Sequence, residues 1–188
     1  MRPIKTSQTH PLPLAAVSTP GSRGRIFYTM CPGKKQPNAA TGPWDRDLET
    51  DLRAITHAKA TTLITLMEDH EVVACDLSRD VLAKACDAHG IAWHHCPIVD
   101  LETPSEQWER TWDELGKDLR RALDDGKNIA LHCRGGRGRA GMIAARLMVE
   151  LGVPVEDAIT QVRAQRPEAI ETPAQEEHVR TIVAITGR

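Results

Sequence analysis

Short apolar runs alternate with segments of helical spacing along most of the chain. Trp44, Leu48, Leu52 and Ile55 recur every three or four residues, which predicts a helix over about residues 45–58. The same spacing predicts further helices over about residues 78–89, 103–123, 142–149, 154–166 and from residue 172 onward. Apolar and β-branched runs predict strands over about residues 12–17, 25–30, 61–67, 91–96 and 128–131.

The order of these segments indicates the class of fold. Because strands and helices alternate along the chain, we expect right-handed crossovers and a single α/β domain, with a mainly parallel central sheet flanked by helices on both faces. Residues 12–17 and 25–30 flank a turn at residues 19–22, so we expect them to pair at the sheet edge. Thr103 and Thr172 each begin a capping box at the start of a predicted helix.

Length and composition set the broad class of protein. We expect one domain over residues 12–188, after a flexible polar segment at residues 1–11. A net charge of −2 argues against nucleic acid as a partner, and no apolar run reaches the roughly 18 residues of a membrane span. Five cysteines at scattered spacings favour a reducing compartment over a disulfide framework. The composition therefore predicts a soluble cytoplasmic protein, and it leaves the oligomeric state open.

The most informative stretch is residues 132–141, which read His-Cys-Arg-Gly-Gly-Arg-Gly-Arg-Ala-Gly between a predicted strand and a predicted helix. Gly135, Gly136 and Gly138 let the backbone turn so that successive amide groups point at one centre. The positive end of the following helix points at the same centre. This signature loop therefore predicts a phosphate-binding site formed by residues 134–139.

Cys133 and Arg139 carry the chemistry of the signature loop. A thiol that faces a helix N-terminus and several arginines should ionise at neutral pH and act as a nucleophile. Arg139 can hold two phosphate oxygens with one planar guanidinium. A thiolate beneath a bound phosphate predicts phosphoryl transfer through a cysteinyl-phosphate intermediate, with no metal and no other cofactor. We expect His132 to tune the thiolate by packing and hydrogen bonding rather than by proton transfer.

The sequence resembles the cysteine-dependent protein tyrosine and dual-specificity phosphatases, and among them the cyclin-dependent-kinase-associated phosphatase group. Besides the signature loop, the likeness includes Cys31-Pro32-Gly33, Pro97-Ile98-Val99-Asp100 and Ala169-Ile170-Glu171-Thr172 with Gln175. It implies the phosphatase fold, with Cys133 as the nucleophile, Arg139 as the phosphate ligand and Asp100 as a general acid on a mobile loop. It also implies that Gln175 orients the attacking water and that the substrate is a phosphorylated protein.

Several residue roles have alternatives. Asp100 follows a predicted strand at the sheet edge where ligands bind, but Glu102 lies two residues further and is a competing acid. Gln175 completes the capping box of Thr172, so it has a structural role available. Lys34 and Lys35 either flank the phosphate entrance or lie in a solvated loop.

Four positions depart from the usual pattern of the resembling family. Ala140 stands where most relatives carry a hydroxyl that stabilises the departing thiolate, so we expect slow breakdown of the phosphoenzyme. Arg134 and Arg137 make the loop unusually basic. They predict polyanionic substrates such as inositol phosphates or phosphoinositides, unless they serve solubility or neighbouring acids. Met67 stands where some relatives carry a second, redox-active cysteine, and the sequence marks no replacement.

Other kinds of chemistry fit the sequence less well. His94, His95 and Cys96 are adjacent on a predicted strand, where side chains point to opposite faces, so we expect no metal site. Ala140 also suits a phosphate-binding module with impaired turnover. A rhodanese-like sulfurtransferase or an arsenate reductase would use the same thiolate, but Asp100 has less purpose there.

Overall fold

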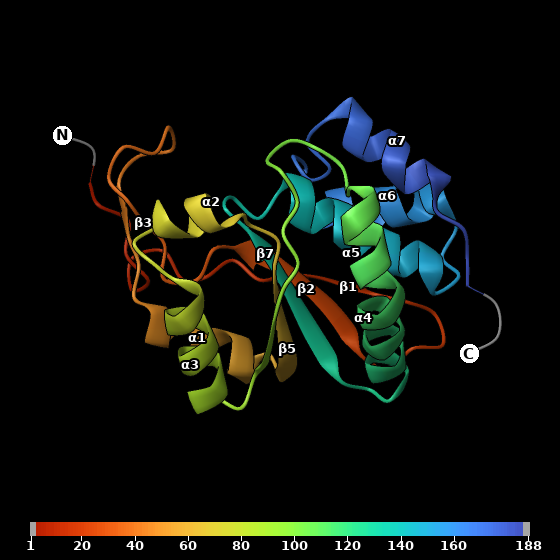
Figure 1. Ribbon diagram of the computed structural model, residues 1–188, viewed down its shortest axis with the longest axis horizontal. Coiled ribbons are helices and arrows are strands. Elements are labelled where there is room, and N and C mark those ends of the chain that lie inside the picture. Colours follow the sequence, from red (N-terminus) through yellow and green to blue (C-terminus); the bar gives the residue numbers. More distant parts are fainter. Residues whose placement is uncertain (1–2, 186–188) are drawn as a thin grey trace.

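The computed structural model describes residues 3–185 and consists of a central sheet with helices packed against both faces (Figure 1). The strand order is β1-β2-β7-β5-β6, with β1 pairing antiparallel to β2 and the other neighbours parallel. The bounds are β1 (Ala15–Ser18), β2 (Arg25–Met30), β5 (Ala60–Thr65), β6 (Ala92–His95) and β7 (Asn128–Cys133). The predicted α/β fold and its antiparallel edge pair are confirmed.

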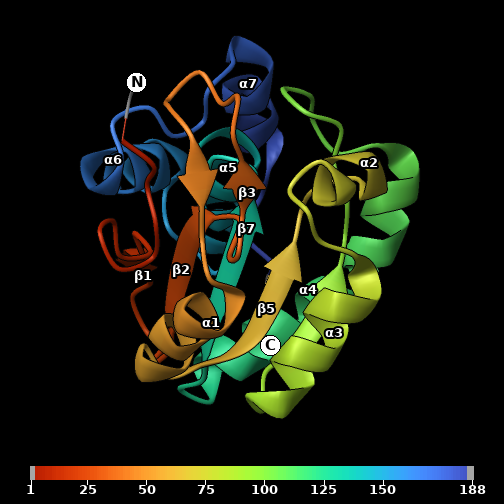
Figure 2. The same cartoon turned by 90° about the vertical axis from the view of Figure 1, so that its left-hand side faces the viewer.

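Helices cover the two faces unequally. On one face lie α1 (Leu48–His57) and α3 (Arg79–Ala88), and on the other lie α4 (Glu106–Asp124), α5 (Gly138–Glu150) and α6 (Val155–Gln165). Helix α7 (Pro173–Thr181) packs outside α5 and α6. The short α2 (Asp69–Val73) lies at one edge of the sheet (Figure 2). A small second sheet pairs β3 (Lys35–Gln36) with β4 (Trp44–Asp45).

Each central strand contributes to two hydrophobic cores, because neighbouring strand residues point to opposite faces. In β7, Ile129 and Leu131 lie in the core beneath α4, α5 and α6, whereas Ala130 lies in the core beneath α1 and α3. Helix α5 is buried along its whole length. This double coverage explains why residues 128–131 form a continuous apolar run instead of an alternating one.

Three local predictions from the sequence were wrong. Helix α4 begins after Ser105, whose hydroxyl accepts a hydrogen bond from the Trp108 amide at 3.2 Å, so the capping box predicted at Thr103 does not form. Both residues are good N-caps, and the start at Ser105 buries Trp108 in the core. Helix α2 was not expected, and Lys35–Gln36 forms a strand inside a segment expected to be loop. At Thr172 the N-cap is confirmed, with the Gln175 N–H donating to its hydroxyl, but the Gln175 side chain accepts from the Glu171 amide, so the reciprocal bond of the predicted capping box goes to the neighbouring residue.

The described part of the N-terminal segment contacts the body of the domain. The Lys5 amide donates to the Pro43 carbonyl at 2.9 Å, and the Asp47 amide donates to the buried Ser7 hydroxyl at 2.9 Å. Flexibility of residues 1–11 and a domain boundary at residue 12 stay predictions, and residues 1–2 lie outside the described residues. Between residues 3 and 185, no helix combines the length and the apolar character that crossing a membrane requires.

Candidate active site

Three parallel strands lead to one edge of the sheet. Because β5, β6 and β7 run in the same direction, their carboxyl ends lie together, where open α/β sheets bind ligands. β5 leads to α2, β6 leads to the segment at residues 97–102, and β7 leads to the signature loop. Figure 2 shows the arrowheads of β5 and β7 pointing to the same end of the sheet, and α2 lies beyond the tip of β5. Residues far apart in the sequence therefore meet around the loop.

Cys133 is the last residue of β7 and is 3% exposed. The Gly136 amide donates a hydrogen bond to the Cys133 Sγ at 3.2 Å. Gly136 has a left-handed φ of +67°, and a Cβ there would lie 2.3 Å from the backbone nitrogen of Met30. Only glycine fits, so the loop turns tightly over β2 and directs an amide at the sulfur. Helix α5 begins at Gly138 and adds the positive end of its dipole.

Arg139 lies in the first turn of α5 and is 2% exposed. Its guanidinium donates to the two carboxylate oxygens of Glu71 at 2.5 and 2.8 Å, and to the Ile98 carbonyl at 2.9 Å. Burial alone would lower the pKa of Arg139, but the hydrogen bonds to Glu71 raise it above its ordinary value. Arg139 is therefore a fixed cation whose plane is set by Glu71.

Glu71 is the site residue that the sequence analysis missed. It lies on α2 and has no exposed surface. Burial would raise the pKa of Glu71, but hydrogen bonds from Arg139 and the Glu68 backbone hold it below its ordinary value. The available signal was the pair Glu68 and Glu71, which form a capping box directly after a buried strand.

Asp100, and not Glu102, is brought to the guanidinium. The Asp100 Oδ1 lies 2.8 Å from the Arg139 Nη2, and the Asp100 side chain is 48% exposed. Leu101, the next residue, has a left-handed φ of +66°, which turns the chain away directly after the acid. Asp100 also lines a pocket of about 200 Å³ together with Cys133 and Arg139. A half-exposed carboxylate beside the pocket suits proton transfer.

Gln175 is buried at the start of α7, and both groups of its amide have partners. Its Oε1 accepts from the Glu171 amide at 3.0 Å, and its Nε2 donates to the Glu102 carbonyl at 3.3 Å. These bonds connect α7 to the segment that carries Asp100. They favour the structural role for Gln175, and its water-orienting role stays a prediction.

His132 lies beneath the loop with no exposed surface. Its Nε2 lies 2.7 Å from the Thr65 hydroxyl, which also accepts a hydrogen bond from the Trp93 indole at 2.9 Å. Because an indole only donates, the Thr65 hydroxyl accepts from Trp93 and joins the indole to the imidazole in one buried hydrogen-bonded chain. Burial lowers the pKa of His132 to about 3, so the ring is neutral at pH 7.

Arg134 and Arg137 pair with acidic neighbours of the signature loop. Arg134 lies 2.8 Å from Glu71, and Arg137 lies 3.4 Å from Glu168. Both guanidinium groups remain about one-third exposed. Acidic side chains of the protein therefore neutralise part of the positive charge of the loop. This favours the alternative in which Arg134 and Arg137 serve neighbouring acids and not a polyanionic substrate.

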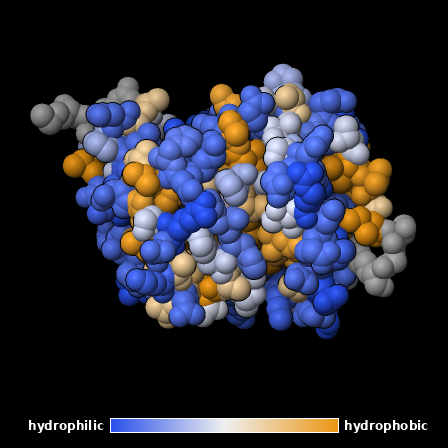
Figure 3. Space-filling view, in the orientation of Figure 1, coloured by the Kyte–Doolittle hydropathy of each residue, from blue (hydrophilic) through white to orange (hydrophobic). Residues whose placement is uncertain are grey.

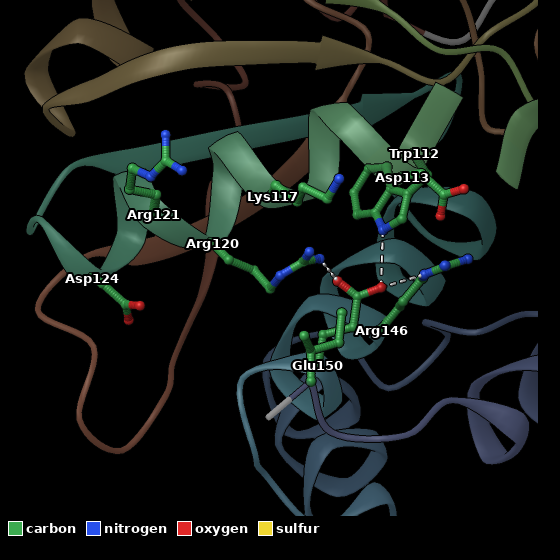
Figure 4. Close-up of a pocket in the computed structure, with 9 residues that line it drawn as sticks. Trp112, Asp113, Lys117, Arg120, Arg121, Asp124, Arg146 and Glu150 are labelled. Atoms are coloured by element: carbon green, nitrogen blue, oxygen red, sulfur yellow. Dashed lines mark hydrogen bonds and ion pairs between the residues drawn. The ribbon is translucent and has the colours of Figure 1, made fainter. Parts of the chain in front are cut away.

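A second, larger cavity lies between α4 and α5, away from the signature loop, with a volume of about 500 Å³. Figure 4 shows three side chains pointing toward the carboxylate of Glu150. Trp112 donates to Glu150 at 2.9 Å, Arg146 at 2.8 Å and Arg120 at 2.5 Å. All four are buried, so this cluster ties the two helices together.

Comparison with known proteins identifies the family. The family described as "Polymorphic toxin system, DSP-PTPase phosphatase" matches residues 39–153, more than half of the chain, including Asp100, Cys133 and Arg139. The chain belongs to this phosphatase family. It is a phosphomonoesterase of the protein tyrosine and dual-specificity type, and the family as a whole uses a cysteine-based mechanism. The resemblance found in the sequence is confirmed.

Individual relatives agree with this assignment. The phosphatase is 32% identical over 126 residues to protein tyrosine phosphatase type IVA 3 of Mus musculus, covering 63% of this chain and 71% of the relative. It is 30% identical over 98 residues to a probable type IVA phosphatase of Dictyostelium discoideum, covering 52% and 57%.

Solved structures share the fold of the phosphatase. Kinase associated phosphatase, with its catalytic site cysteine replaced by serine, superposes with a TM-score of 0.76 at 22% identity, covering 90% of this chain and 92% of that one. The active form of Tk-PTP gives a TM-score of 0.63 at 25% identity, covering 87% and 96%. The single-domain phosphatase fold is thereby confirmed.

Proposed function

We propose that this phosphatase hydrolyses phosphorylated protein side chains through a cysteinyl-phosphate on Cys133. The observation that carries the proposal is the amide of Gly136 donating to the Cys133 sulfur beside the fixed guanidinium of Arg139. An amide donor and a helix N-terminus both favour an ionised sulfur, and a buried cation beside it attracts the dianionic phosphoryl group. No metal or other cofactor enters this mechanism.

The reaction proceeds in two steps. In the first, the Cys133 thiolate attacks phosphorus, the bond from phosphorus to the leaving oxygen breaks, and Asp100 gives its proton to that oxygen. In the second, water attacks the phosphoenzyme, Asp100 takes a proton from the water, and the thiolate departs. Arg139 and the amides of residues 134–139 hold the equatorial oxygens throughout.

A protein substrate is favoured over a small polyanion by the surroundings of the pocket. Val99 and Leu101 are exposed beside Asp100, and Ala39 and Ala40 line the pocket. Figure 3 shows hydrophobic patches at the top of a mainly hydrophilic face, where Figure 1 places the loop after β6. An apolar rim suits the ring of phosphotyrosine. Inositol phosphates and phosphoinositides remain the second candidate, supported by the part of Arg134 and Arg137 that is exposed.

The compartment is proposed on the state of the thiols. Cys31, Cys75, Cys86, Cys96 and Cys133 are all free and buried. Free thiols and a reactive thiolate suit a reducing compartment such as the cytoplasm.

The test is hydrolysis of p-nitrophenyl phosphate and of a phosphotyrosine peptide by the wild type, with and without orthovanadate. We expect vanadate-sensitive turnover of both substrates by the wild type and its loss in Cys133→Ser. Cys86 lies in the core beneath α1 and α3, so the control variant Cys86→Ser should retain turnover. A folded wild type that hydrolyses neither substrate would contradict the proposal. Faster hydrolysis of soluble inositol phosphates than of the peptide would select the second candidate.

A further inference from the structure

Lys34 is a buried cation without a carboxylate partner in the part of the chain that the structure describes. It is 5% exposed and lines the pocket of Cys133 and Arg139. The four arginines that are buried among residues 3–185 all pair with buried or half-buried acids: Arg46 with Asp51, Arg120 with Glu150, Arg139 with Glu71, and Arg146 with Glu150 and Glu109. The Lys34 ammonium instead has one long hydrogen bond, to the Arg134 carbonyl at 3.5 Å. A buried charge is costly unless an anion compensates it.

The backbone around Lys34 is fixed by a buried ion pair. Arg46 and Asp51 are joined by two hydrogen bonds of 2.8 Å, and the Asp51 carboxylate also accepts from the Gly33 amide at 2.9 Å. The Arg46 amide donates to the Lys34 carbonyl at 3.1 Å, and the Lys35 amide donates to the Cys75 carbonyl at 3.1 Å.

Local conformation adds to this rigidity. Gly33 has a left-handed φ of +69°, and a Cβ there would lie 2.8 Å from the Leu48 side chain, so glycine is required. A segment rich in Pro, Gly and Lys, which on sequence alone suits a solvated loop, is therefore a rigid support. Its consequence is that one ammonium group is held against the phosphate pocket.

The groups that face Lys34 are thiols and one arginine. Burial lowers the pKa of Lys34, the thiols of Cys75, Cys31 and Cys133 oppose this when ionised, and Arg134 reinforces it. Cys31 and Cys75 hydrogen-bond to each other. Cys133 is the one of these three thiols that lines the phosphate pocket together with Lys34. The ring of Trp44, 5.8 Å from the ammonium, offers only a weak further interaction.

We propose that Lys34 is the second cation of the phosphate site, whose ammonium stabilises the Cys133 thiolate and then binds an oxygen of the phosphoryl group. This inference rests on the proposed function. Much of the charge of Arg139 is already neutralised, because its guanidinium pairs with the carboxylates of both Glu71 and Asp100. The Lys34 ammonium supplies positive charge that no carboxylate in the described part of the chain neutralises. Lys34 forms and breaks no covalent bond in the reaction. Its ammonium adds positive charge next to the phosphoryl oxygens, where negative charge accumulates in the transition state.

The test compares Lys34→Met with Lys35→Met, a matched change one residue away. The Lys35 side chain is half exposed and pairs with Asp76 at 3.5 Å, so its loss should leave the site unchanged. Two readouts are measured: inhibition by inorganic phosphate, and the pH dependence of Cys133 alkylation by iodoacetamide, located by peptide mass spectrometry. For Lys34→Met we expect about tenfold weaker phosphate binding and an alkylation midpoint about one pH unit higher. Lys34→Arg should restore both toward the wild type.

Different outcomes would contradict the role of Lys34 and the proposed function. Unchanged phosphate inhibition and alkylation in a folded Lys34→Met enzyme overturn the inference and leave the proposed function standing. A change in Cys75 alkylation alone also overturns it, because the ammonium then serves the Cys31–Cys75 pair. A wild type with no vanadate-sensitive turnover removes the proposed function itself. Should Lys34→Met fail to fold, Lys34→Gln, which keeps the length and polarity of the side chain, answers the same question.

Discussion

The imidazole of His132 works as a neutral hydrogen-bonding group directly behind the nucleophile. The Thr65 hydroxyl contacts its Nε2, and the Trp93 indole donates a hydrogen bond to that hydroxyl. A ring that stays neutral cannot exchange protons with the sulfur during turnover, which agrees with the tuning role expected from the sequence. The same property makes the stability of the protein depend on pH.

We predict that His132 destabilises the folded protein as the pH falls. Its pKa is about 3 in the folded state and about 6.5 in an unfolded chain, so between these values only the unfolded state binds the proton. The free energy of unfolding should therefore fall by about 1.4 kcal/mol per pH unit from this residue below pH 6.5. Urea denaturation between pH 7.5 and 5 gives the free energy of unfolding at each pH. We expect this free energy to fall less steeply with decreasing pH in His132→Gln than in the wild type. The exposed His57→Gln control should keep the wild-type slope, and equal slopes in all three would contradict the assignment.

We expect Ala140 to govern the second step of the proposed reaction. It is fully buried in the first turn of α5 and offers no hydroxyl to the sulfur. We predict a burst of p-nitrophenol close to one equivalent per enzyme in rapid-mixing experiments, because the phosphoenzyme breaks down more slowly than it forms. Ala140→Ser should shrink the burst and raise the steady-state rate severalfold. Steady-state kinetics without a burst in the wild type would show that formation limits turnover.

Among the elements, the short helix α2 has the largest influence on the site for its size. It carries Glu71, which fixes the plane of Arg139 and also contacts Arg134. Its start depends on the reciprocal cap between Glu68 and Glu71, so one carboxylate serves both the helix and the guanidinium.

We predict that Glu71→Gln lowers stability by about 3 kcal/mol, because removing one partner leaves Arg139 buried without its counter-charge. Catalytic efficiency should fall as well, since the guanidinium loses its orientation. Asp69→Asn is the matched control on the same helix, because its pair with Arg79 is exposed and should contribute little. Urea denaturation and p-nitrophenyl phosphate kinetics measure the two effects. A Glu71→Gln variant as active as Asp69→Asn would contradict the positioning role.

Sequence periodicity predicted the long elements well, because burial on two faces imposes a clear pattern on residues 128–131 and 142–149. It failed for α2 and β3, which are too short for any period and depend on tertiary partners. The loop around Cys133 and Arg139 could be recognised because its glycines and helix start are local features. The spacing of Glu68 and Glu71 could indicate a helix start, but the contact of Glu71 with Arg139 arises only in the folded arrangement. For Lys34 the sequence left the phosphate entrance and a solvated loop as alternatives, because its burial depends on tertiary contacts.

At the scale of the whole molecule, the Glu150 cluster joins α4 to the C-terminal end of α5. Glu109 on α4 adds two further bonds to Arg146, at 2.6 and 2.7 Å. The cluster lies outside the pocket of Cys133, so it should stabilise the fold without taking part in the chemistry.

We predict that Glu150→Ala destabilises the protein by about 3–5 kcal/mol, because two buried guanidinium groups lose their shared carboxylate. Catalytic efficiency below the melting transition should stay within about twofold of the wild type. Glu114→Ala removes an exposed partner of Lys117 on the same helix and should change the stability little. Thermal melts together with kinetics at 20 °C below the lower melting temperature would check both parts. A large loss of activity in a folded Glu150→Ala enzyme would mean that the cluster is coupled to the site.

The contact between Asp100 and Arg139 makes the acid a tethered competitor of the substrate. In the proposed reaction, we expect each incoming phosphoryl group to displace this carboxylate from the guanidinium, which lowers the net affinity for the substrate. After hydrolysis the same carboxylate can return and help expel inorganic phosphate. Removing it, as in Asp100→Ala, should therefore slow turnover and at the same time tighten the grip on phosphorylated ligands, which makes this variant suited to capturing the natural substrate.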